Sequence, residues 1–203
     1  MVKRKKNERG KGVIKVISGG QTGADQAALR CARDLGLKTG GTAPRDFRTS
    51  TGKSPTLKWL YSLEELDCPK DTPLPAQYAQ RSILNVRNSD GSFVFRITRS
   101  PGTDHTLAYC QSKNWGTPKL GLDNSIPPTS SYKPVFGVHK DLLAMGNKEW
   151  KGSSLWKKEV ARAKQFLREH NIHTLNVFGH RSRPDDNRFE QRVYTFLKEV
   201  LDK

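Results

Sequence analysis

The chain lacks any long apolar run. Nowhere do about eighteen apolar residues follow one another, which excludes an ordinary transmembrane helix. The first residues, MVKRKKNERGKG, are charged and have no apolar middle, so they do not form a secretory signal. Cysteine is scarce too: Cys31, Cys68 and Cys110 are odd in number and form no CxxC pair, which argues against a disulfide framework and a zinc finger. We therefore expect a cytoplasmic protein with no membrane partner.

The common nucleotide-binding and catalytic fingerprints are also missing. No GxGxxG motif is present, and Gly52-Lys53-Ser54 only resembles a Walker ending, because Phe47 stands where the first glycine of that loop belongs. The histidines have no cysteine or carboxylate set around them, so no metal site is expected. No Ser-His-Asp or Cys-His arrangement can be argued, and the catalytic residues, if any, stay unknown.

What the chain has in excess is positive charge. It holds 36 Lys and Arg against 20 Asp and Glu, a formal net charge of +16. Residues 1–12 are too polar and too basic to pack, and we expect them to form a disordered arm. Such an arm either attaches nonspecifically to nucleic acid or only solubilises the protein. Residues 13–203 have the length of a single domain.

Short β-branched runs alternate with stretches of helical spacing along this domain. Strands are expected at 13–17, 37–41, 93–98, 118–122 and 174–179, and helices at 24–35, 78–88, 103–115, 156–169 and 189–200. Residues 57–76 are expected to be loop with at most one helical turn, and residues 123–152 an insertion of unassigned structure. The alternation predicts an α/β fold, a Rossmann-like three-layer sandwich with a mostly parallel sheet.

Three polar, glycine-marked turns follow expected strands, at 18–23, 100–106 and 179–183. In such folds ligands bind at the carboxyl ends of the strands. The glycines of the first turn permit a tight backbone path with free amides at a helix start, which suits phosphate, although they can equally serve only to close the turn. Thr103 or Thr106 can bond a phosphate or cap its own helix, and Arg181 can pair with an anion.

Five blocks of the sequence, in order, resemble the putative molybdenum carrier family, within the SLOG superfamily of Rossmann-like proteins. They are SGGQTGADQAAL at 18–29, GGTAPRDFR at 40–48, YAQRSILNVRNSDGSFVF at 78–95, SPGTDHT at 100–106 and LNVFGHR at 175–181. The resemblance spans most of residues 13–202. The chain departs from the family at Phe178-Gly179-His180-Arg181, where members typically have Ala-Gly-Pro-Arg.

The resemblance implies a ligand-binding fold. Family members are described as carriers of the molybdenum cofactor, and the wider superfamily binds nucleotides or molecules derived from them. By matching position, the resemblance implies four groups of cofactor-binding residues around one pocket. The first wall of the pocket is formed by Gly19, Gly20, Gln21, Thr22, Gly23 and Asp25, the second by Asn85, Ser89, Asp90 and Gly91, and the third by Gly102, Thr103 and Thr106. Gly179 and Arg181 complete the pocket.

Three functions are in competition. The first is a non-catalytic binding or carrier protein for a phosphate-bearing small molecule, the molybdenum cofactor (molybdopterin) or a related nucleotide. The second is a nucleotide hydrolase or transferase that uses Asp25, Asp90 or Asp104, or a sensor of a nucleotide ligand. Thr106 stands where the related cytokinin-activating phosphoribohydrolases carry glutamate, which argues against N-glycoside hydrolysis. The third is a nucleic-acid-associated basic protein.

A homo-oligomer is a further expectation. Rossmann-like proteins often pair through their helices. Trp150, Trp156 and Phe166 can provide such an interface, or they can belong to the core.

Overall fold

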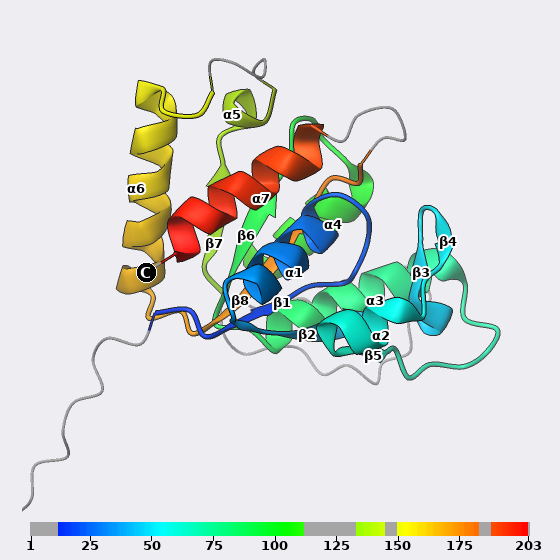
Figure 1. Cartoon of the computed structure of the whole chain (residues 1–203). Coiled ribbons are helices and arrows are strands. Elements are labelled where there is room, and N and C mark those ends of the chain that lie inside the picture. The colour runs from blue at the N-terminus through cyan, green and yellow to red at the C-terminus, as the bar shows by residue number, and fades with distance from the viewer. Residues whose placement is uncertain (1–11, 112–132, 145–149, 183–187, 203) are drawn as a thin grey trace, which may run out of the picture.

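The computed structural model describes residues 12–111, 133–144, 150–182 and 188–202 (Figure 1). Their main feature is a six-stranded parallel sheet with the order β5-β2-β1-β8-β6-β7. The strands are β1 (Lys15–Ile17), β2 (Lys38–Ala43), β5 (Leu63–Glu65), β6 (Gly91–Phe95), β7 (Val135–Val138) and β8 (Thr174–Gly179). A separate antiparallel hairpin pairs β3 (Arg48–Thr49) with β4 (Gly52–Lys53).

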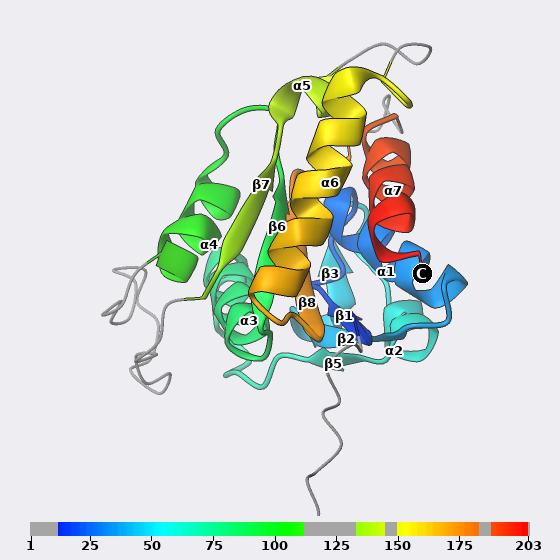
Figure 2. The same cartoon turned by 90° about the vertical axis from the view of Figure 1, so that its left-hand side faces the viewer.

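Helices cover both faces of the sheet, as Figure 2 shows. One face carries α1 (Ala24–Asp34), α6 (Ser154–Glu169) and α7 (Arg188–Leu201), and the other carries α3 (Leu74–Arg87) and α4 (Pro101–Gln111). Shorter helical pieces are η1 (Arg45–Phe47), α2 (Thr56–Tyr61) and α5 (Lys140–Ala144). The predicted α/β class, a Rossmann-like three-layer arrangement, is confirmed.

The core follows from the alternation of side chains along the strands. On β6, Phe93 and Phe95 pack on the side of α1, α6 and α7, whereas Val94 packs on the side of α3 and α4. The two tryptophans weighed as an oligomer surface lie in the larger core. Trp150 and Trp156 are buried, and their rings meet edge to face at 4.7 Å. Their burial removes them as a basis for the expected oligomer.

A segment expected to be loop and a segment left unassigned both contribute strands. Residues 57–76 include most of α2 and all of β5, and residues 123–152 include β7 and α5. Both strands lie at the edges of the sheet and are only three or four residues long, so they give almost no periodic signal. The strand expected at 118–122 and most of the basic arm lie outside the described residues.

None of the helices in the described ranges combines the length and the apolar character needed to cross a membrane.

Candidate functional site

The turn at residues 18–23 lies where the order of the sheet reverses. From β1 the chain moves through β2 to β5 on one side, while β8, β6 and β7 occupy the other side. Because all six strands are parallel, the turn after β1 and the loop after β8 leave the sheet at the same edge. The two loops are in contact, since the Ala24 amide donates to the carbonyl of His180 (3.1 Å). This is the position at which open α/β folds bind ligands.

Two amides of the turn are used within the protein. The Gln21 amide donates to Oδ2 of Asp25 (3.2 Å), and the Thr22 amide donates to Oε1 of Gln21 (3.1 Å). Gln21 and Asp25 thus fold back on their own backbone and occupy donors that the sequence predicted to be free for an anion. Any ligand at this edge must rely on side-chain donors as well.

Asp25 forms a buried ion pair with Arg81, which comes from α3 on the other face of the sheet. Nη1 of Arg81 lies 3.1 Å from Oδ2 of Asp25, and both side chains are almost fully buried. Burial raises the pKa of Asp25, while the Arg81 charge and hydrogen bonds from Gln21 and Ser18 oppose the rise. The pair therefore fixes a carboxylate at the start of α1, where the helix dipole favours negative charge.

The glycines of the turn are required mainly by contacts inside the protein. A Cβ on Gly19 would overlap the Arg81 guanidinium, and a Cβ on Gly23 would overlap the backbone at His180. Gly20 has a φ of +73°, and a Cβ there would stand 2.7 Å from Cδ1 of Leu63, in the core. Gly20 therefore faces apolar side chains, and its small size serves packing.

Two buried donors beside the turn have no acceptor among the described residues. These are Nε2 of Gln21 and Nε of Arg81, in side chains that belong to residues only 4% and 8% exposed. A buried donor without a partner costs free energy, so each marks a place where an acceptor from outside the protein would be stabilising.

The hairpin β3–β4 lies against the same turn. The Ser50 amide donates to Oε1 of Gln21 (2.6 Å), and the hydroxyl of Ser50 pairs with that of Thr22 (2.7 Å). These bonds fix the Gln21 side chain by its oxygen, and its buried nitrogen has no hydrogen-bond partner among the described residues.

Arg181 adds an exposed cation at this edge. Its guanidinium lies over the ring of Tyr78 at 5.0 Å, and the Arg81 guanidinium lies 6.0 Å from the same ring. Tyr78 thus links the loop after β8 to α3. Gly179, just before this loop, is needed because a Cβ there would overlap the carbonyl of Phe95.

Asn85 lies beside the turn, but its side chain is occupied. Its Oδ1 accepts from the Thr42 amide (2.7 Å), and its Nδ2 donates to the Thr42 carbonyl (3.0 Å). β1 pairs with β2 only as far as Ile17 and Gly40. Beyond this pair, the Asn85 side chain hydrogen-bonds the backbone N–H and C=O of Thr42 in place of β1. Asn85 therefore stabilises the sheet, and its side-chain oxygen and nitrogen are both already hydrogen-bonded.

The start of α4 forms the third expected wall, and it is capped by its own loop. The hydroxyl of Ser100 donates to Oγ1 of Thr103 (3.2 Å), and the hydroxyl of Thr106 donates to the carbonyl of Gly102 (3.0 Å). Thr103 and Thr106 are buried, and only Gly102 is exposed. Of the two roles predicted for these threonines, the geometry favours a structural one within the helix.

Ser89, Asp90 and Gly91 lie at the opposite edge of the sheet, because Ser89 and Asp90 precede β6, Gly91 begins it, and the strands are parallel. Oδ2 of Asp90 accepts from the amides of His173 (2.9 Å) and Thr174 (2.7 Å), at the start of β8. The Ser89 hydroxyl donates to the Val86 carbonyl (2.8 Å). The expectation that they share a pocket with the glycine turn is therefore corrected.

The three carboxylates considered for catalysis do not converge. Asp25 lies in the first turn of α1 beside the glycine turn, Asp90 lies at the far edge, and Asp104 pairs with Arg96 and Arg99, which follow β6. Within the described ranges, no three His, Cys, Asp or Glu side chains are grouped so that they could hold a metal ion.

Sequence reasoning missed Arg81, Tyr78 and Ser50 as residues of this site. The sequence contained a signal for Tyr78 and Arg81, since both lie in the YAQRSILNVRNSDG block that resembles the family. The predicted site residues, however, were taken from the second half of that block. Ser50 lies in a polar stretch without a pattern, and only the folding of the hairpin brings it to Gln21.

Comparisons with known proteins agree with this fold. A family model described as the circularly permutated YpsA SLOG family matches residues 16–131, more than half of the chain. A solved structure described as a putative molybdenum carrier protein from Syntrophus aciditrophicus SB is similar with a TM-score of 0.66 and 23% sequence identity. The similarity covers 94% of this chain and 96% of that chain. No curated protein matches the chain.

Proposed function

We propose that this chain, which belongs to the circularly permutated YpsA SLOG family, is a binding or carrier protein for a phosphate-bearing small molecule. The site is the edge formed by the glycine turn, the start of α3 and the loop after β8. The ligand is the molybdenum cofactor or a related nucleotide. The description of the structural neighbour as a molybdenum carrier motivates the first choice, and the resemblance to nucleotide-binding SLOG proteins motivates the second.

The observation that carries the proposal is the pair of buried donors without acceptors, Nε2 of Gln21 and Nε of Arg81. Phosphate oxygens are strong acceptors, and guanidinium groups bind them with charge-assisted hydrogen bonds. Arg181 supplies a second cation at the same edge. These donors fit the phosphate that a molybdopterin and a nucleotide have in common. They are hydrogen-bond donors and cations, so they do not provide ligands for a bare metal cation.

The first experiment identifies the ligand. Purified protein is analysed by mass spectrometry for co-purifying small molecules, and its melting temperature is measured with molybdopterin species and with a panel of nucleotides. A ligand at a hundred times its dissociation constant should stabilise the fold by about 2.7 kcal/mol. If neither assay finds a phosphate-bearing ligand, the proposal is wrong.

The second experiment locates the site. Gln21→Glu keeps an oxygen that accepts from Thr22 and Ser50 but removes the free donor and adds a negative charge. We expect this variant and Arg181→Gln to lower the affinity for the ligand by about tenfold each, the loss of one charged or buried hydrogen bond. Arg87→Gln, at the other end of α3, is the matched control and should bind as the wild type does. Unchanged binding by a folded Gln21→Glu protein would place the ligand elsewhere.

A nucleotide hydrolase or transferase is the second candidate, and one observation favours it. Of the three candidate carboxyls, Asp25 is the one that contacts the glycine turn, where its Oδ2 accepts from the Gln21 amide; burial also raises its pKa, as is common for general acids. Incubation of the wild type with nucleotides should then give products that Asp25→Asn does not form. An unchanged nucleotide panel would leave binding alone as the function.

A further inference from the structure

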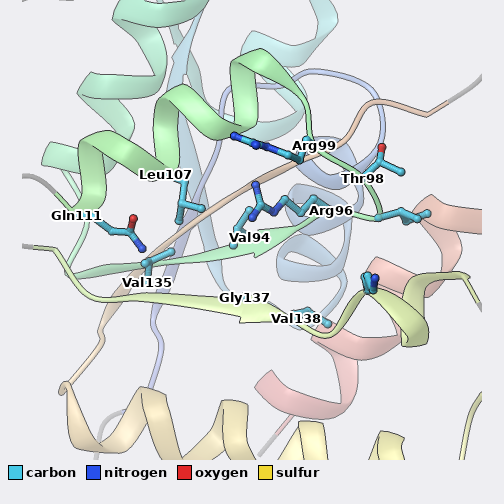
Figure 3. Close-up of a pocket in the computed structure, with 11 residues that line it drawn as sticks. Val94, Arg96, Thr98, Arg99, Leu107, Gln111, Val135, Gly137 and Val138 are labelled. Carbon is cyan, nitrogen blue, oxygen red and sulfur yellow. The ribbon is translucent and has the colours of Figure 1, made fainter.

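A cleft of about 660 Å³ lies between α4 and the strands β6 and β7, away from the glycine turn (Figure 3). Its volume is in the range that holds small-molecule ligands. The buried side of α4, with Thr103, Thr106 and Cys110, packs toward the interior, whereas Leu107 and Gln111 line the cleft. None of the residues assigned above to the phosphate site lines the cleft, and the two regions meet where the Ile97 amide donates to Nδ1 of His180 (3.3 Å).

The floor of the cleft is apolar. Val94 on β6, Val135 on β7 and Leu107 on α4 contribute side chains to it, and Figure 3 shows Leu107 and Gln111 pointing from the helix toward the strands. Gly137 on β7 pairs in register with Val94, so both residues face the same side of the sheet. The absence of a side chain at Gly137 leaves part of the cleft open.

The rim of the cleft is cationic. Arg96 and Arg99 follow β6, and Lys140 begins α5. Asp104 is the only acidic residue paired with them in the described part of the chain; it contacts Arg96 and lies 3.3 Å from Nε of Arg99. Three positive charges against one carboxylate leave the rim with an excess of positive charge.

We propose that this cleft is a second binding site, for a small amphiphilic anion: an apolar body that lies on Val94, Leu107 and Val135, with a carboxylate, sulfonate or phosphate group held by Arg96, Arg99 and Lys140. The apolar floor supplies the hydrophobic contact, and the rim supplies charge-assisted hydrogen bonds. Asp104 competes with the ligand for the two arginines.

The probe is 8-anilinonaphthalene-1-sulfonate, which combines an aromatic body with one anionic group and fluoresces when it leaves water. We expect one probe to bind per chain, with an affinity that falls as salt is added. N-Phenyl-1-naphthylamine, a similar aromatic body without the charge, should bind at least about fivefold more weakly if the rim contributes. Inorganic phosphate alone should compete only poorly, because it lacks the apolar part.

Gly137→Val is the decisive variant. A Cβ at this position meets only Cγ1 of Val94, at 3.7 Å, an ordinary contact, and a valine suits a strand and adds volume on the side of the cleft. We expect the variant to melt at or above the wild-type temperature and to lose binding of the probe. A folded Gly137→Val protein that binds the probe as tightly as the wild type overturns the proposal.

Two charge variants should act in opposite directions. Lys140→Gln should weaken binding, and Asp104→Asn should strengthen it by releasing Arg96 and Arg99, each by about fivefold. Lys157→Gln, an exposed lysine on α6, is the matched control for the loss of one charge and should have no effect. If Asp104→Asn weakens binding or leaves it unchanged, the rim does not hold the anion and the proposal fails. Arg181→Gln should leave probe binding intact, which separates this site from the glycine turn.

Discussion

At the scale of single residues, the Asp25–Arg81 pair decides the electrostatics of the glycine turn. The two groups come from opposite faces of the sheet and meet where both side chains are almost fully buried. Removal of one partner from such a pair leaves an uncompensated buried charge, which costs about 3–5 kcal/mol.

Arg81→Gln should therefore lower the free energy of unfolding, and more so at high pH. Burial already holds the pKa of Asp25 above its ordinary value of 3.8, and loss of the Arg81 charge raises it further. A carboxyl with a raised folded-state pKa gives its full contribution to stability below the unfolded-state pKa, and this contribution is lost as the pH rises through the folded-state pKa. Urea unfolding at about pH 5 and about pH 8 should show the larger deficit at the higher pH. The double variant Asp25→Asn with Arg81→Gln should lose this pH dependence, and its persistence there would contradict the assignment.

Gly20 gives a residue-scale test of what the turn requires. Gly20→Val places a branched side chain at a φ of +73° and within 2.7 Å of Leu63, so we expect the free energy of unfolding to fall by about 2 kcal/mol or more. Melting temperature and ligand affinity should be measured on the same sample. Because Gly20 faces the core, the fraction that remains folded should bind the ligand normally; a stable protein with no affinity would show instead that the ligand contacts Gly20.

At the scale of elements, Asn85 connects α3 to the sheet where β1 and β2 separate. Its amide satisfies both backbone groups of Thr42 in the interior, as an adjacent strand would. The contact explains how the glycine turn can leave the sheet without exposing unpaired groups of β2.

Asn85→Ala should lower the free energy of unfolding by about 2–3 kcal/mol, because two buried backbone groups lose their partners. Asn85→Asp should cost more near neutral pH, since a carboxylate accepts from the Thr42 amide but cannot donate to the Thr42 carbonyl. Denaturant titrations measure both. Equal stability of Asn85→Ala and the wild type would mean that water replaces the amide, and that this contact does not hold the sheet together.

The elements also show what sequence patterns can and cannot predict. β8 was predicted with its observed bounds, and α1 and α3 within a few residues, because β-branched runs and helical spacing are strong where one side of an element is buried. β5 and β7 were missed because edge strands of three or four residues carry no such pattern. Ser89, Asp90 and Gly91 were placed at the wrong edge because the family resemblance was followed, although their position before the strand expected at 93–98 already puts them at the amino end of a parallel strand. Arg81 was missed as a site residue because its partner, Asp25, is distant in sequence and approaches only through packing.

At the scale of the whole molecule, the burial of the cysteines offers a test of the core. Burial raises the pKa of the Cys31 thiol to about 12 and that of the Cys110 thiol to about 11, whereas Cys68 is partly exposed. Thiolates are the reactive form, so at about pH 8 only Cys68 should react rapidly with a thiol reagent in the native protein. All three cysteines should react after denaturation. Rapid native reaction of Cys31 or Cys110, identified by peptide mapping, would show that α1 or α4 does not pack as described.

The net charge of +16 is a property of the whole chain, and its consequence depends on where the charge lies. Residues 1–11 hold six basic side chains and one acidic one in a small part of the length, and the rest of the excess is spread over the folded domain. Each phosphate contact adds about 0.9 to the slope of log affinity against log salt for duplex DNA. If the arm carries nonspecific binding, deletion of residues 1–11 should reduce that slope by several units and weaken DNA binding at low salt.

The same deletion should not change the affinity for the phosphate-bearing small molecule, because the glycine turn and its donors begin at residue 18. Fluorescence anisotropy with a labelled duplex at several salt concentrations, run beside the small-molecule titration, measures both effects. A truncated protein whose salt slope equals that of the full chain would assign nucleic-acid binding to the folded surface. If truncation instead lowers the affinity for the small molecule, the arm forms part of the ligand site at the carboxyl edge of the sheet.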